Sequence, residues 1–170
     1  MKKLLLLSAL CLAAGCTHPA PTRYQTLRIE KFRQIRNDPK RHAGRLCAFA
    51  GRVINAEQTK EQVVFRILVQ DRIAGTGEEL AGEGPLTVVY PGGETTVAEG
   101  HQVKVLGYMR QPSIGKDLFG KTVSALTMDA IAVYDFFTKY EFYVGSEEAI
   151  YNKWKTGEPL TPAEVRRTGR

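Results

Sequence analysis

Histidine and cysteine side chains are the first candidates for chemistry in this chain, because they supply nucleophiles, proton acceptors and metal ligands near neutral pH. The three histidines are His18, His42 and His101. None of them is paired with a second histidine or with a cysteine in the pattern that zinc sites use. The sequence therefore predicts no metal site and no cofactor.

Cys47 and His101 leave one catalytic alternative open, in which a thiolate beside an imidazole acts as the nucleophile. Against it, Cys47 shares its strand parity with Phe49 and Val53, which indicates a buried core cysteine. Most carboxylates lie in glycine-rich and polar stretches, where nothing holds two of them across a substrate. We expect a protein that is not an enzyme, and no catalytic residue is assigned.

Polar side chains on the expected strands are the better candidates for a binding surface. On the parity opposite to the core the strands carry Arg52, Arg66, Lys104, Tyr108 and Arg110. Cations contact phosphates and other anions, and aromatic rings stack on planar groups. Two interpretations stay open, a basic and partly aromatic ligand-binding groove or a solvated outer face.

The strands that position these residues follow from alternation of apolar and polar side chains. Alternation runs through residues 45–53, 62–70 and 101–110, and shorter β-prone stretches cover residues 86–90 and 122–136. Gly51 and Gly107 interrupt two of the strands, as expected where a small barrel bends. Glycine-rich residues 74–84 and residues 111–121 are predicted as loops.

Helical patterns lie before and after the strands, not between them. Residues 27–37 place Ile29, Phe32 and Ile35 three apart, and Asp38-Pro39 ends this predicted helix. A short helical segment is expected after residue 145. Because no helical pattern separates the strands, parallel α/β folds are disfavoured. We expect a mainly β fold, a small five-stranded barrel preceded by a helix and followed by a short C-terminal helical segment.

Several of these segments together resemble the oligonucleotide/oligosaccharide-binding (OB) fold. The matching segments are Asp38-Pro39, Gly44-Arg45-Leu46, residues 49–53 and residues 100–107. The resemblance implies an OB-like barrel whose ligands bind on the exposed face of the middle strands and the flanking loops. The same features are similar to the Slp type of outer-membrane lipoprotein.

The N-terminus has the order of a bacterial lipoprotein signal. Lys2 and Lys3 precede an apolar run over residues 4–14, which is shorter than the roughly 20 residues that a membrane-spanning helix needs. Residues 12–16, LAAGC, resemble a lipobox. This resemblance implies that Cys16 is the first mature residue and carries three acyl chains such as palmitate. Thr17, in place of aspartate, implies sorting to the outer membrane.

Composition fits one ordinary globular domain behind this signal. Hydrophobic residues make up 43% of the chain and charged residues 25%, which argues against disorder, a collagen-like repeat and a multi-span membrane protein. Removal of 15 residues leaves 170 − 15 = 155, and loss of Lys2 and Lys3 lowers the net charge from +6 to +4. The predicted organisation is a signal peptide at 1–15, a tether at 16–25, the barrel with its N-terminal helix at 26–145, and a C-terminal helix and tail at 146–170.

Aromatic residues gather in the last third of the chain. Eight of the fifteen in the chain lie between residues 134 and 154, namely Tyr134, Phe136, Phe137, Tyr140, Phe142, Tyr143, Tyr151 and Trp154. They form either a dock for a partner or the membrane interface, or a segment that packs over an open end of the barrel. In the docking interpretation Tyr151 and Trp154 are the contact residues.

The sequence thus favours a lipid-anchored module of the outer membrane, facing the periplasm, with a non-enzymatic binding or structural role. Its expected partners are the membrane, through the N-terminal lipid, and an envelope protein or anionic glycan; nucleic acid is not expected. Two alternatives stay open: a subunit of an outer-membrane protein complex that docks through residues 134–154, and an enzyme acting on envelope polymers.

Overall fold

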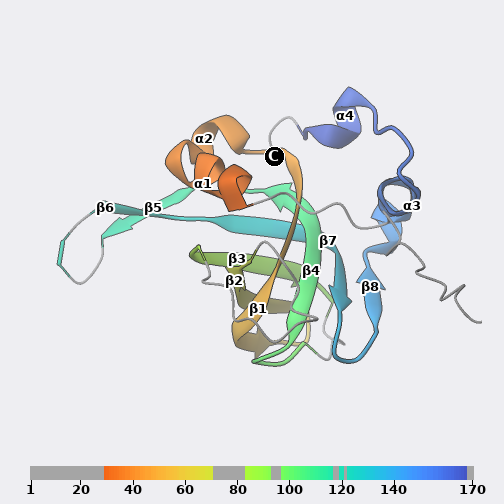
Figure 1. Cartoon of the computed structure of the whole chain (residues 1–170), viewed down its shortest axis with the longest axis horizontal. Helices are drawn as coiled ribbons and strands as arrows, with labels where there is room; N and C mark the ends of the chain where they lie inside the picture. The colour runs from red at the N-terminus through yellow and green to blue at the C-terminus, as the bar shows by residue number, and fades with distance from the viewer. Residues whose placement is uncertain (1–28, 71–82, 93–96, 117–118, 121, 168–170) are drawn as a thin grey trace, which may run out of the picture.

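A closed barrel of five strands forms the centre of the structure (Figure 1). The computed structural model describes residues 29–70, 83–92, 97–116, 119–120 and 122–167. The barrel strands are β1 (Leu46–Gln58), β2 (Gln62–Val69), β3 (Pro85–Pro91), β4 (Gln102–Met109) and β7 (Thr127–Asp135). They pair in the order β3-β2-β1-β4-β7, and a parallel pairing of β3 with β7 closes the sheet. The expected mainly β fold with an OB-like barrel is confirmed.

Two glycines let neighbouring strands cross at the bends of the barrel. A Cβ atom on Gly51 would lie 2.4 Å from the carbonyl oxygen of Leu68, and one on Gly107 would lie 2.3 Å from that of Asp129. The strand register shifts between Leu106 and Gly107 of β4 and, in β1, further along than Gly51, between Val53 and Asn55. At both glycines the neighbouring backbone leaves no room for a side chain.

Helix α1 (Ile29–Asn37) contributes to the core of the barrel. Phe32 and Ile35 are fully buried, and the ring of Phe32 meets that of Phe49 edge-on, 5.3 Å between centroids. The side chains of β2 that are predicted to point inward are buried, namely Val63, Phe65, Ile67 and Val69. The helix therefore supplies large apolar side chains to an interior that the short strands do not fill alone.

Asp38 ends α1 as predicted, and it also starts a further short helix. Its carboxylate accepts a hydrogen bond from the backbone N–H of Arg41, the first turn of α2 (Pro39–His42). Pro39 stands at the first helical position, where it has no N–H to satisfy. The Asp-Pro pair therefore acts as a boundary between two helices.

Strands β5 (Ser113–Lys116) and β6 (Thr122–Ala125) form a hairpin where the sequence predicts a loop and the start of one long strand. Figure 1 shows this hairpin extending away from the barrel. All four residues of β5 are exposed, so no apolar alternation marks the strand. A further short strand, β8 (Glu141–Tyr143), pairs with the end of β7.

The C-terminal elements are a 3-10 turn η1 (Gly145–Glu147), helix α3 (Glu148–Thr156) and helix α4 (Pro162–Val165). Ala48 of β1, Leu106 of β4 and Ala132 of β7 lie side by side on the outer wall of the barrel, and Tyr151 of α3 packs on them. Helix α3 therefore packs against the wall of the barrel, not over an open end. Ala48 and Ala50, which the strand parity places on the outer face, are consequently buried.

The predicted signal peptide at 1–15 and tether at 16–25 lie outside the described residues. Within the described part, no helix has the length and the apolar character needed to cross a bilayer.

Candidate functional site

Three predicted cations lie on one diagonal across the outer face of the barrel. Arg52 of β1 stands opposite Leu68 of β2 and Gln102 of β4. Arg66 lies two residues from Leu68, and Lys104 lies two residues from Gln102, on opposite sides of Arg52. Diagonal neighbours in a sheet are about 7–8 Å apart. Arg66, Arg52 and Lys104, here called the basic row, therefore follow one line across three strands.

Aromatic rings stand at the Lys104 end of the basic row. Tyr134 of β7 lies directly opposite Lys104. The ammonium nitrogen of Lys104 is 5.7 Å from the centre of the Phe136 ring, and the rings of Tyr134 and Phe136 meet edge-on at 4.7 Å. A cation over an aromatic face is electrostatically stabilised. The end of the row thus combines a positive charge with ring surfaces.

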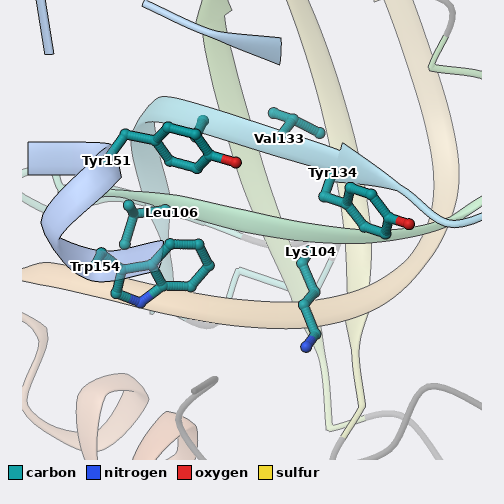
Figure 2. A pocket seen from close by; sticks show the side chains of 7 residues that line it. Lys104, Leu106, Val133, Tyr134, Tyr151 and Trp154 are labelled. Carbon is teal, nitrogen blue, oxygen red and sulfur yellow. The ribbon is translucent and has the colours of Figure 1, made fainter. Parts of the chain in front are cut away.

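Helix α3 turns this end of the row into a shallow cleft of about 180 Å³, including the part open to solvent. Figure 2 shows Tyr151 and Trp154 of α3 on one side, with Leu106 between these two, and Lys104 and Tyr134 on the other side. The cleft is smaller than the usual pocket for a whole small molecule. Its enclosed space holds about one water molecule, so a ring of a longer ligand would lie on the surface of the cleft and not inside it.

Burial lowers the pKa of Lys104 from its ordinary value, because the surrounding rings remove part of the water that stabilises an ammonium group. A negative charge nearby would favour the charged form of Lys104, and the rings beside it offer planar surfaces.

Tyr108 and Arg110 do not belong to this site. Tyr108 is 3% exposed, its hydroxyl donates to the carbonyl of Glu164 at 2.8 Å, and the guanidinium of Arg167 lies 4.0 Å from its ring centre. The prediction of Tyr108 as a ligand-binding residue is corrected, because the C-terminal segment covers it. Arg110 lies beyond the other end of β4 and donates to a carboxylate oxygen of Asp129 at 2.8 Å.

Tyr151 and Trp154 also take a different place from the predicted dock. Tyr151 is 2% exposed and stacks on Tyr143, with ring centres 5.3 Å apart, while Trp154 is half-buried. Tyr151 therefore offers no open surface to a protein partner, and both residues serve as the wall of the cleft. The sequence analysis did not place Tyr134 and Phe136 in the ligand-binding surface. Only the pairing of β4 with β7 shows that these two aromatic residues lie beside Lys104.

The alternative pairing of Cys47 with His101 is contradicted by the strand register. Cys47 lies opposite Gly107, whereas His101 stands six residues earlier, a separation of about 20 Å along the strand. Cys47 is buried, and burial raises the pKa of its thiol to about 11. Among the described residues, no group of three or more histidine, cysteine or acidic side chains is arranged to hold a metal ion.

No protein-family model matches the sequence, and no curated protein matches it. Among solved structures, the chain is similar to the small single-stranded DNA-binding protein from Streptomyces coelicolor, with 18% sequence identity and a TM-score of 0.42. The match covers 56% of this chain and 96% of that one.

This comparison corrects one expectation. Nucleic acid is not among the partners expected from the sequence, whereas the matched protein is a single-stranded DNA-binding protein, so the exclusion of nucleic acid is corrected.

Proposed function

We propose that this chain is a non-enzymatic binding module of the bacterial envelope, held at the periplasmic face of the outer membrane by acyl chains on Cys16. The lipobox-like LAAGC at residues 12–16 supports the anchor. One structural observation carries the binding role: the basic row of Arg66, Arg52 and Lys104 ends in an aromatic cleft on the barrel's outer face.

The geometry of the row selects the chemistry of the ligand. Three cationic residues whose backbone positions are about 7–8 Å apart match a chain with repeated anionic groups, since each group can meet one cation. Tyr134 and Trp154 at the end of the row add surfaces on which a planar ring stacks. The proposed ligand is an anionic chain that carries rings, and its rings distinguish it from a simple polyanion.

Binding of a fluorescent oligothymidine of about twelve nucleotides, a length within the range that OB folds cover, tests this chemistry on the full chain. Inorganic polyphosphate serves as a competitor with charges and no rings. We expect salt-dependent binding, with an affinity at least about tenfold lower in the double variant R52Q/K104Q. R110Q is the matched control. It also removes a cation, but at a position beyond the end of β4 and away from the basic row.

The single tryptophan of the chain offers a second readout, because Trp154 lines the cleft. Its emission is expected to change when oligothymidine binds and to stay constant with polyphosphate. An equal loss of affinity in R110Q and R52Q/K104Q, or the absence of binding by the unsubstituted protein, contradicts the proposed site.

A further inference from the structure

Two large aromatic side chains project from the turn between β7 and β8. Phe137 is 77% exposed and Tyr140 is 64% exposed. Figure 1 shows this turn at the opposite end of β7 from the β5–β6 hairpin. Exposed apolar side chains that gather at one place mark an interaction site more often than single ones do. Phe137 and Tyr140 are here called the aromatic tip.

The ring of Phe137 is supported from behind by the contact between His101 and Asp135. It stacks on the imidazole of His101, with 4.8 Å between ring centres and 27° between planes. The Nδ1 atom of His101 lies 2.6 Å from a carboxylate oxygen of Asp135, which is fully buried. The other oxygen of Asp135 accepts hydrogen bonds from the backbone N–H groups of Phe137 and Thr138.

The ring of Tyr140 is supported by the core. It stacks on Phe142, with 6.2 Å between centres and 13° between planes. Phe142 packs against the barrel core and lies 6.4 Å from the ring of Tyr90. Both exposed rings are thus held in place before any partner arrives, so a partner does not have to order them.

The composition of the tip matches the interface of a lipid bilayer. Lys139 stands between Phe137 and Tyr140, is exposed, and has a left-handed φ of 62°. Amphipathic aromatic rings sit at the headgroup level of membranes, and lysine adds attraction to anionic lipids. A phenyl ring, a phenol and an ammonium group within four residues therefore favour a membrane surface over a dry protein interface, whose core is depleted of lysine.

The length of chain before the barrel allows this contact. Thirteen residues, 16–28, separate the proposed lipid on Cys16 from the start of α1. At full extension they reach at most about 45 Å. A compact domain of this size is about 40 Å across, so a tether of this length does not prevent the tip from reaching the bilayer.

We propose that the aromatic tip inserts into the headgroup region of the membrane and sets the orientation of the anchored barrel. The inference rests on the proposed function, since the acyl chains of Cys16 bring the barrel to the bilayer. The Lys104 end of the basic row lies next to the tip, since Lys104 contacts Phe136, the residue before Phe137.

Quenching by brominated lipids tests the insertion. The full-length gene is expressed with F137W, the protein is extracted from membranes, and it is reconstituted into phosphatidylethanolamine–phosphatidylglycerol vesicles with or without bromine on the acyl chains. The unsubstituted protein gives the contribution of Trp154. F119W is the matched control, because Phe119 is 94% exposed in the segment that joins β5 to β6. The intact mass of each sample reports the acyl chains on Cys16.

We expect acylated protein in which brominated lipids reduce the added F137W emission by about twofold, as for an aromatic ring at the headgroup level. F119W is expected to lose no emission beyond that of the unsubstituted protein. Acylated F137W that is not quenched overturns the role of the tip and leaves the anchor in place, and quenching of F119W instead assigns the contact to the β5–β6 hairpin. A mass without acyl chains overturns the anchor and this inference together.

Discussion

Asp135 shows how one buried carboxyl group organises a surface feature. Its carboxylate is fully buried and is shared between His101 and the backbone of the turn that carries Phe137. A buried carboxyl group requires such hydrogen-bond partners, because without them the full cost of removing the group from water is not offset. The sequence shows His101 and Asp135 34 residues apart, and no local pattern connects them.

Replacing Asp135 with asparagine is expected to destabilise the fold by about 3 kcal/mol, because the amide cannot accept from both neighbours with the same strength. Urea unfolding followed by circular dichroism measures the change. D129N is the control: Asp129 pairs with Arg110 at the surface, and exposed pairs contribute less than about 1 kcal/mol. Similar costs for D135N and D129N contradict the structural role of the buried pair.

Cys47 is expected to be chemically inert in the folded protein. Burial raises its thiol pKa from 9.0 to about 11, so the thiolate fraction at neutral pH falls by about a hundredfold. Alkylation at pH 8 followed by peptide mapping is expected to label Cys47 only after denaturant is added. Rapid labelling of Cys47 in the native protein contradicts its burial and reopens the interpretation as a nucleophile.

At the scale of elements, alternation and glycine placement were sufficient to predict the barrel strands, and a stripe of apolar residues was sufficient to predict α1. The hairpin β5–β6 and the strand β8 were missed. All four residues of β5 are exposed, so apolar and polar side chains do not alternate along it, and β8 has only three residues. The basic row could not be predicted, because it depends on how neighbouring strands align, and residue spacing within one strand does not determine that register. Tyr108 was misassigned because the segment that covers it lies 56 residues further along the chain.

Gly107→Ala is expected to destabilise the barrel by about 2–3 kcal/mol, because the new methyl group meets the carbonyl of Asp129 at 2.3 Å. G115A is the matched control, since Gly115 also lies in a strand and a methyl group added there would have no atom within 4 Å. Thermal unfolding of both variants measures the difference. If G107A is as stable as G115A, the close approach of the two backbones at Gly107 does not limit the residue at this position, which contradicts the prediction.

The C-terminal helices are expected to add stability that depends on pH. Hydrogen bonds from Lys153 and from the backbone of Thr161 lower the pKa of Glu164 from 4.5 to about 2. A depressed carboxyl pKa stabilises the fold above pH 4.5, and this contribution disappears as the pH falls toward 2. E164Q is therefore expected to melt below the unsubstituted protein near neutral pH and to converge with it in acid.

The exposed control for this comparison is E148Q, at the start of α3. Melting curves at several pH values between about 2 and 7 give the result, since that window spans the two pKa values of Glu164. The role of Glu164 as the carboxylate that pairs α4 with Lys153 of α3 is contradicted if the difference in melting temperature between E164Q and the unsubstituted protein stays constant over this pH window.

At the scale of the whole molecule, two exposed features lie on one small barrel. The wall between β2 and α3 carries the basic row and its cleft, and the turn after β7 carries the aromatic tip. We propose that the acyl chains and the tip hold the barrel at the bilayer, while the basic row meets the ligand.

The intact mass of the protein recovered from the membrane fraction tests this account most directly. We predict a chain of 155 residues that begins at Cys16 and carries three acyl chains, given 170 − 15 residues after cleavage before the lipobox cysteine. A chain without acyl chains, recovered from the soluble fraction, contradicts the anchor and removes the reason to place the barrel at a membrane.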